Sequence, residues 1–397
     1  MNSSEALNAF NFWMGVECLS PNKVIKTGKD PVTKALTWDI ASDAELPWRD
    51  GAKQDMMRRH DLTRKIKSGI PSWRYVAYGA VMPMEPVVDQ VRRMLEVKPD
   101  TLGEFRVGEP IAALAIPLDV NGMVSDLPFI ASLPWAMGRL LRAGDQERLD
   151  FAGFFGPRAF QERMIERIVM LLWQRGLLAR DGSEPLKMLL ATFGSMNDAP
   201  QRPINHADIE DICTLLFQEG GWTPVELKTW LRLNAEPCVQ NGKQAPEPDD
   251  TEMLNSFFVE DINLVAQSVM RDGPGEALAA YLTPHAPQHR IDVRAPGDTT
   301  VEDGVMPAHA PLARWPSGHG GLVRAQQFAV NTVMGRLLGQ RGMVSVNGPP
   351  GTGKTTLLRD IVAAIVVERA EAMAHYDDPL KAFTTPIRVE GWKFGEV

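Results

Sequence analysis

The residues of this chain best suited to chemistry are Gly348 to Thr356, which read GPPGTGKTT and match the pattern GxxxxGK[ST]. Glycine lets backbone N–H groups approach a phosphate closely and adopts dihedral angles that a Cβ disfavours. Successive amides of residues 351–356 can therefore surround an oxyanion at the positive end of a helix. The pattern predicts a nucleotide-binding loop whose residues contact ATP: Gly348, Pro349, Pro350, Gly351, Thr352, Gly353, Lys354, Thr355 and Thr356.

Three side chains of this loop have separate expected roles. Lys354 is expected to reach the β- and γ-phosphates as a point charge, and the Thr355 hydroxyl to ligate Mg²⁺. The hydroxyl and amide of Thr356 are expected nearest the α-phosphate. Lys354 and Thr355 are thus the predicted catalytic residues, Thr355 is the predicted metal ligand, and ATP and Mg²⁺ are the predicted cofactors.

A strand and a helix must position such a loop. Met343, Val344 and Val346 predict a short strand before it. A helix is predicted from about Lys354 to Arg369, with Leu357, Leu358, Ile361, Val362, Ile365 and Val366 on its apolar side.

Upstream, residues 322–330 read LVRAQQFAV. This segment resembles the Q motif of superfamily 1 helicases related to the nonsense-mediated-decay helicase, and the resemblance extends over about residues 322–372. It implies that Gln326 reads the adenine edge, because an amide offers a donor and an acceptor together. A helix is predicted here too, with an apolar face of Phe328, Val330, Val333, Met334 and Leu337.

The resemblance implies a helicase or translocase that couples ATP hydrolysis to movement on single-stranded DNA or RNA. Residues 377–383, DDPLKAF, also resemble an insertion in large bacterial helicases of this type, some of which belong to antiviral defence systems. GPPGTGKT occurs in AAA+ ATPases as well, so a ring-forming ATPase remains open. A nucleotide-gated or structural interaction module without hydrolysis, in which residues 1–290 bind a partner protein, is the third interpretation.

The later motor motifs are missing from the sequence. No apolar strand ending in Asp-Glu follows the loop, and no arginine-finger motif or second motor domain follows it. The acidic pairs at residues 210–211 and 260–261 precede the loop in helix-like contexts, so we interpret them as exposed surface acids. We therefore expect a fragment, a truncated product or one half of a split protein, whose core a partner chain or downstream polypeptide completes. The isolated chain is expected to bind ATP weakly and to hydrolyse it slowly or not at all.

The rest of the chain predicts a multidomain protein in which an α+β module and a mainly helical region precede the first βα unit of an incomplete P-loop (RecA-like) α/β domain. Asn121-Gly122 predicts a hairpin with a type I′ turn between strands at 111–120 and 123–131. Further helices are predicted near 206–218, 224–234, 252–271 and 275–282. The expected divisions are 1–72, a helical or irregular segment; 73–145, the α+β module; 146–283, the helical domain; 284–321, a linker rich in proline and glycine; and 322–397, the start of the ATPase domain.

Composition excludes several classes of protein. The 397 residues are 44% hydrophobic and 23% charged, with a net charge of −8, which argues against a protein that coats nucleic acid through bulk charge. Cys18, Cys213 and Cys238 form no CxxC pair, so neither a disulfide framework nor a zinc knuckle is indicated. No uncharged apolar run approaches the roughly 20 residues that span a bilayer, and no targeting segment is recognised. We expect a soluble cytoplasmic protein with no membrane partner.

Overall fold

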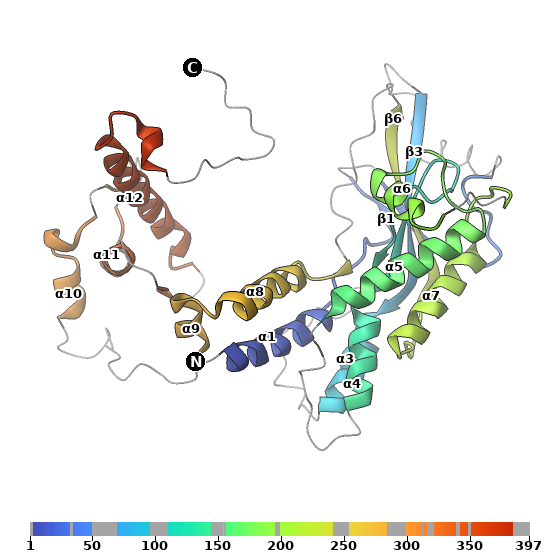
Figure 1. Cartoon of the computed structure of the whole chain (residues 1–397), viewed down its shortest axis with the longest axis horizontal. Helices are drawn as coiled ribbons and strands as arrows, with labels where there is room; N and C mark the ends of the chain where they lie inside the picture. Colours follow the sequence, from blue (N-terminus) through green and yellow to red (C-terminus); the bar gives the residue numbers. More distant parts are fainter. Residues whose placement is uncertain are drawn as a thin grey trace. The chain divides into compact units, whose positions relative to one another are not determined.

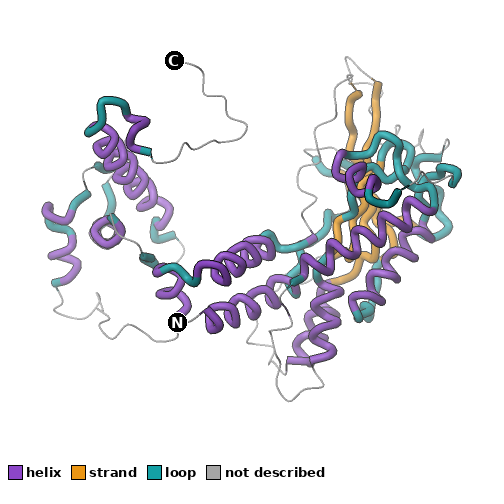
Figure 2. Tube along the Cα trace, viewed as in Figure 1, coloured by secondary structure: helices purple, strands orange, loops and turns teal. Residues whose placement is uncertain are grey.

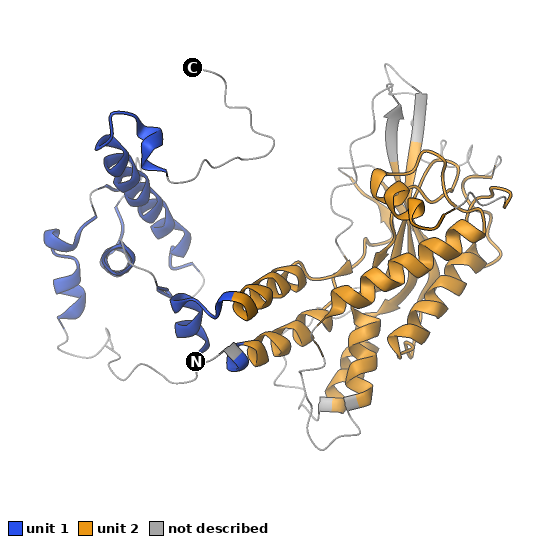
Figure 3. Ribbon diagram, viewed as in Figure 1, with its two compact units in different colours: residues 1–6, 272–397 blue, residues 7–271 orange. Residues whose placement is uncertain are grey.

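The computed structural model describes residues 3–31, 35–49, 70–95, 110–143, 154, 156–194, 199–240, 254–283, 299–311, 313–315, 321–338, 342–347 and 351–383. The chain divides into two compact units, residues 7–271 and residues 1–6 with 272–397 (Figure 3). None of the described helices is both long and apolar enough to cross a bilayer.

The unit of residues 7–271 is built on one antiparallel sheet (Figure 2). Its strands follow the order β1-β2-β6-β3-β4-β5, and each neighbouring pair is antiparallel. The strands are β1 Gly28–Lys29, β2 Leu36–Ile40, β3 Ile70–Pro83, β4 Pro110–Leu118, β5 Phe129–Ile130 and β6 Thr229–Gln240. The two longest strands, β3 and β6, pair with each other at the centre, so segments far apart in sequence form the middle of the sheet.

Helices accompany this sheet, and their ends follow from local sequence. The helices are α1 Ser3–Cys18, α3 Met84–Leu95, α4 Leu133–Ala143, α5 Pro157–Gln174, α6 Glu184–Ala191, α7 His206–Gly220 and α8 Phe258–Asp272 (Figure 1). Proline occupies the first position of α5, where its missing N–H costs no hydrogen bond. Asn205 and Asp208 form a reciprocal capping box at the start of α7, and Gly221, with φ 77°, ends that helix.

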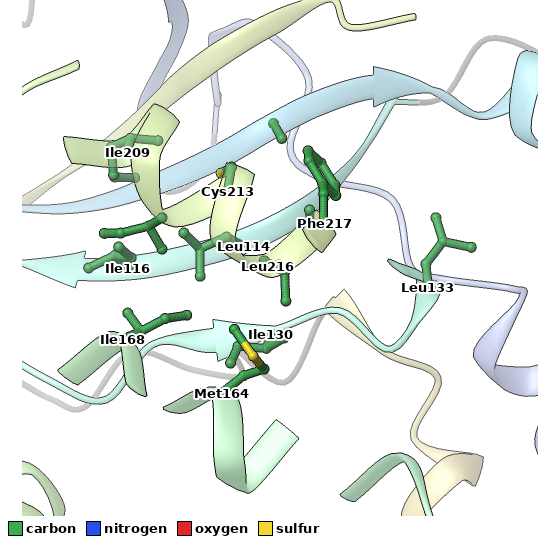
Figure 4. Packing of buried hydrophobic residues seen from close by; sticks show 14 of the residues in the cluster. Leu114, Ile116, Ile130, Leu133, Met164, Ile168, Ile209, Cys213, Leu216 and Phe217 are labelled. Carbon is green, nitrogen blue, oxygen red and sulfur yellow. The ribbon is translucent and has the colours of Figure 1, made fainter. Parts of the chain in front are cut away.

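The main core lies between one face of the sheet and helices α4, α5 and α7. Figure 4 shows side chains of α5 and α7, such as Met164 and Phe217, in one apolar layer with Leu114 of β4. Helix α7 comes close to β3 at Gly79, where an added Cβ would stand 2.6 Å from Cys213 Sγ. Glycine at this position therefore sets how closely the helix approaches the sheet.

The opposite face of the sheet carries a buried ion pair. Arg232 of β6 is fully buried, and its Nε donates a 2.6 Å hydrogen bond to Asp39 Oδ1 of β2. Its two terminal nitrogens donate to Asp39 Oδ2 and to the carbonyl of Ile25. Burial and the neighbouring Glu236 raise the pKa of Tyr78 to about 12, against an opposing effect of Arg232. Each nitrogen of the guanidinium thus donates a hydrogen bond, and this cluster holds β2, β6 and the segment before β1 together.

The second unit, as far as it is described, consists of short helices and one long one. They are α9 Glu276–Leu282, α10 Thr300–Gly304, η5 Pro307–His309, α11 Arg324–Leu337, α12 Lys354–Ala374 and η6 Pro379–Ala382. Val330 and Met334 of α11 pack with Leu357 and Ala364 of α12 in a small apolar cluster. Asn331 Nδ2 of α11 donates a 2.8 Å hydrogen bond to the carbonyl of Gly304, which fixes α10 against α11. Part of the expected linker at 284–321 is therefore folded onto α11.

The helix expected near 224–234 is wrong. Residues 229–240 form β6, a central strand, so the expected helical domain at 146–283 contributes to the same sheet as the α+β module. Leu231, Leu233 and Ala235 alternate along the strand and are buried on its helix-covered face. Arg232 and Asn234 between them hide the alternation, because they are polar residues that are also buried.

The turn at residues 119–123 brings Val124 back to an isolated antiparallel bridge with Leu118, and the strand expected at 123–131 is reduced to β5 at Phe129–Ile130. The turn is also not of type I′. Gly122 has φ 75°, whereas Asn121 does not have the positive φ that a type I′ turn requires. Asp119 Oδ1 instead accepts hydrogen bonds from the backbone N–H groups of Asn121 and Met123, at 2.8 and 2.9 Å. The side chain of Asp119 therefore determines this turn.

The strand expected at Met343 to Val346 is also wrong. Residues 342–347 have no regular secondary structure, and Met343 and Val346 are exposed. A strand needs a neighbour to pair its backbone, and the described residues of this unit supply none. The sheet formed by the described strands is antiparallel and lies in the other unit. The architecture of the described residues is therefore mixed α/β, and this sheet does not match the parallel sheet of a RecA-like domain.

Candidate nucleotide-binding site

The described part of the glycine-rich loop turns directly into α12. Gly351 and Gly353 adopt left-handed backbone angles, with φ 80° and 75°, which glycine adopts without steric cost. Gly353 precedes the first residue of the helix, Lys354, and its carbonyl accepts the N–H groups of Thr356 and Leu357 at 2.9 and 3.3 Å. Of the expected nucleotide ligands, Gly348, Pro349 and Pro350 lie outside the described residues.

The three side chains with expected roles lie together in the first turn of α12. Lys354, Thr355 and Thr356 are all exposed, and they follow one another at the amino end of a 21-residue helix. The unsatisfied N–H groups and the dipole of a long helix favour an anion at this end. One ammonium and two hydroxyl groups therefore occupy the end of the helix that attracts negative charge.

Gln326 of α11 lies against this loop. Its Nε2 donates a 2.9 Å hydrogen bond to the carbonyl of Thr352, and its Oε1 accepts a 3.1 Å hydrogen bond from the N–H of Val323. Both ends of the amide thus bond to the protein itself. The side chain connects the start of α11 to the loop before α12, although the two segments are 26 residues apart. One N–H of Nε2 and one lone pair of Oε1 are not used by these two hydrogen bonds.

The space around the two loop glycines differs. A Cβ on Gly351 would have no neighbour within 4 Å, whereas a Cβ on Gly353 would stand 2.4 Å from Gln326 Nε2. The open side of the loop is therefore at Gly351, and the side at Gly353 is closed by Gln326. An exposed loop with an open glycine, a lysine and two threonines fits a phosphate group with its bound Mg²⁺.

Much of the apolar side expected for α12 is exposed. Leu358, Val362 and Val366 have 54%, 50% and 59% of their surface accessible, and their spacing of four residues places them on one face. Leu357 and Ala364 on another face are buried against α11. The helix therefore has two apolar faces, of which the described residues cover one.

The acidic pairs upstream of the loop bond to arginines. Asp211 of α7 lies 2.9 Å from Arg175, and Glu260 of α8 lies 3.6 Å from Arg158. Both pairs are on helices, as expected for surface acids. No group of three or more His, Cys, Asp or Glu side chains within the described ranges is arranged to hold a metal ion.

A hollow that no sequence motif predicts lies beside β5. Its volume is about 320 Å³, and its lining includes Phe129, Ile165 and Phe257. Gln161 and Asn255 also line it, but their amide nitrogens both donate to the carbonyl of Ile130, at 3.0 and 2.9 Å. The hollow therefore offers mainly apolar surface, because these two amide nitrogens already donate to the backbone.

Comparison with known proteins assigns this chain to no group. No family model matches it, no curated protein is significantly similar to it, and no solved structure resembles it.

Proposed function

We propose that the segment from Gly348 to Thr356 binds the phosphates of ATP with Mg²⁺, and that the chain is the ATP-binding portion of a superfamily 1 helicase or translocase. One observation carries the nucleotide site. The motif begins helix α12 at Lys354, with two left-handed glycines before it and the Gln326 side chain bonded to Thr352. This combines the residue types of the motif with the local backbone that a phosphate loop requires.

The proposed roles follow the position of each group. The amides of residues 351–355 and the Lys354 ammonium bind the phosphate oxygens, and the Thr355 hydroxyl binds Mg²⁺. Bound Mg²⁺ neutralises phosphate charge. Gln326 is proposed to contact adenine and to keep Thr352 in place when no base is bound. The hydrogen bond to Thr352 supports the second of these roles directly.

The exposed face of α12 supports the assignment to an α/β ATPase. In a P-loop domain the helix after the loop packs against a parallel sheet. Leu358, Val362 and Val366 provide an apolar face of the right kind for such packing. We propose that strands from a partner chain or from further polypeptide cover this face and supply the acidic residues of the complete motor.

The nucleotide site is tested by titrating the chain with a fluorescent ATP analogue, with and without Mg²⁺. Lys354→Ala is expected to weaken binding by about 10- to 100-fold, because a charge-assisted hydrogen bond contributes about 1.5–3 kcal/mol. Arg359→Ala is the matched control, since Arg359 is an exposed cation on the same helix, beyond its first turn. Equal affinities of the unmodified chain and Lys354→Ala would refute the site.

The motor function is tested on the complete protein isolated from its own host. Its ATPase activity is expected to rise with single-stranded DNA or RNA, and its nucleic-acid affinity to fall with salt. Absence of stimulation by both nucleic acids contradicts the helicase assignment. Rings that assemble only with ATP would identify an AAA+ ATPase instead. Capture of a protein partner that survives Lys354→Ala and removal of nucleotide would identify an interaction module.

A further inference from the structure

Three arginines come together on two packed helices of the sheet-containing unit. Arg139 and Arg142 are three residues apart on α4 and therefore share a face of that helix. Arg163 belongs to α5, which packs against α4 (Figure 1). Burial lowers the pKa of Arg139, and the charges of Arg142 and Arg163 lower it further. The geometry agrees: Arg163 lies one turn before Arg167, which pairs with Glu219 at the end of α7, and Arg142 Nη2 would stand 3.9 Å from a Cβ on Gly221 at the same end.

Among the described residues, an aromatic ring and not a polar group holds Arg139 in place. Its guanidinium carbon lies 4.7 Å from the centroid of the Trp135 ring, one turn earlier on α4. Trp135 is buried and packs edge-on against Phe154, so the ring is a fixed platform. The Nε of Arg139 is buried and makes no hydrogen bond with the described residues. The Trp135 ring, and not a carboxylate, therefore sets the orientation of the Arg139 guanidinium and of its N–H donors.

Arg158 and Arg167 of α5 pair with carboxylates, whereas the three clustered arginines pair with no carboxylate of the described residues. Arg158 pairs with Glu162 at 2.8 Å, and Arg167 pairs with Glu219 of α7. Arg142 donates only to the backbone carbonyl of Gly138, at 3.1 Å. Among the described residues, none of Arg139, Arg142 and Arg163 forms an ion pair. Converging like charges destabilise the fold, so an unneutralised group of them indicates a bound anion.

We infer that Arg139, Arg142 and Arg163 form a binding site for a phosphate group, carried either by the backbone of a single-stranded nucleic acid or by a small phosphate. Guanidinium groups match phosphate because their planar fork of N–H donors bonds two oxygens at once. Arg142 and Arg163 are exposed and meet the ligand first. Arg139, fixed on Trp135, contributes a pre-oriented charge. The site lies in residues 7–271 and does not depend on the proposed ATP loop.

The test uses the full chain without nucleotide. A fluorescein-labelled 20-nucleotide single strand is titrated by anisotropy at low salt, and inorganic phosphate is titrated by calorimetry. Arg142→Ala and Arg163→Ala are each expected to weaken binding about 3- to 10-fold, and the double variant about 10- to 100-fold. If the strand is the ligand, the double variant should also reduce the slope of log affinity against log salt by about 1.4, at 0.7 for each phosphate contact.

Arg158→Ala is the matched control, because Arg158 is an exposed arginine of the same helix that is already paired with Glu162. Arg139→Lys keeps the positive charge but removes the planar guanidinium with its paired N–H donors. Circular dichroism checks that each variant is folded. Loss of strand binding in the cluster variants alone identifies nucleic acid as the source of the phosphate. Binding of inorganic phosphate alone, lost in the same variants, identifies a small phosphate. Binding of neither probe, or equal loss in Arg158→Ala, overturns the inference.

Discussion

Alanine at the two loop glycines should have different effects, although both glycines have the same backbone conformation. Gly351 and Gly353 have φ 80° and 75°, so alanine at either position incurs about 1–2 kcal/mol of left-handed strain. Only at Gly353 does the new Cβ collide, at 2.4 Å from Gln326 Nε2. The flexible end of Gln326 can move away, but its hydrogen bond to Thr352 is then lost. That bond contributes about 0.5–1.5 kcal/mol.

Gly353→Ala should therefore destabilise the start of α12 by about 1 kcal/mol more than Gly351→Ala. Hydrogen exchange followed by mass spectrometry can measure this difference in a peptide that covers Thr356 and Leu357, whose N–H groups donate to Gly353 O. We expect exchange in this peptide to be about fivefold faster in Gly353→Ala than in Gly351→Ala. A peptide from α5 should show no change in either variant.

A third variant separates the hydrogen bond from the strain. In a Gln326→Ala background the collision and the hydrogen bond are both absent, so the two alanine substitutions should have equal effects. The reasoning is refuted if Gly351→Ala and Gly353→Ala accelerate exchange equally in the unmodified chain. It is refuted as well if the excess of Gly353→Ala persists after Gln326→Ala, because the contact would then not be its cause.

Three further predictions concern the sheet-containing unit. Burial alone would raise the pKa of Asp208, but hydrogen bonds from Arg202, Asn205 and Arg175 outweigh it and lower that pKa. The contribution of the Asp208 carboxylate to stability is therefore complete above about pH 4, and it is lost as the pH falls through the lowered pKa of the folded state. In urea unfolding at pH 7, Asp208→Asn should cost about 2–3 kcal/mol and the more exposed Asp211→Asn less than about 1; equal costs would contradict this. Gly79→Ala should lower the free energy of unfolding by about 1–3 kcal/mol, because the new Cβ would stand 2.6 Å from Cys213 Sγ. Adding Cys213→Ala should recover part of that free energy in the same assay, whereas additive effects of the two substitutions would exclude the contact. Because burial raises the pKa of Cys18 to about 12, iodoacetamide at pH 8 should leave this thiol unmodified in the folded chain and alkylate it in urea; rapid modification of the folded chain would contradict its burial.

Elements with a strong local signal could be predicted from the sequence. The helices α7, α11 and α12 follow the helical periodicity of their own residues and lie where the sequence predicts them. β6 could not be predicted in this way, because buried Arg232 and Asn234 conceal its alternation. What makes it a strand is pairing with β2 and β3, whose residues lie far away in sequence.

In the candidate site, too, the features set by neighbouring residues could be predicted, whereas the contacts between distant segments could not. The left-handed glycines and the helix that begins at Lys354 depend on residues next to one another, and the motif predicts them. The hydrogen bond from Gln326 to Thr352 joins helix α11 to the loop before α12, and only the structure reveals it. The arginine cluster on α4 and α5 has no sequence motif, because Arg163 comes from a different helix from Arg139 and Arg142.

The loop before α12 is therefore fixed from one side in the described structure. A phosphate loop is ordinarily positioned by a strand before it and a helix after it, and residues 342–347 provide no strand here. Helix α12 fixes the carboxyl side of the loop, and Gln326 provides a single hydrogen bond next to it. A loop with one fixed end must lose more conformational freedom when it closes around phosphates, which lowers affinity. If strands that cover the exposed face of α12 also order residues 342–347, they should raise ATP affinity without adding any contact to the nucleotide.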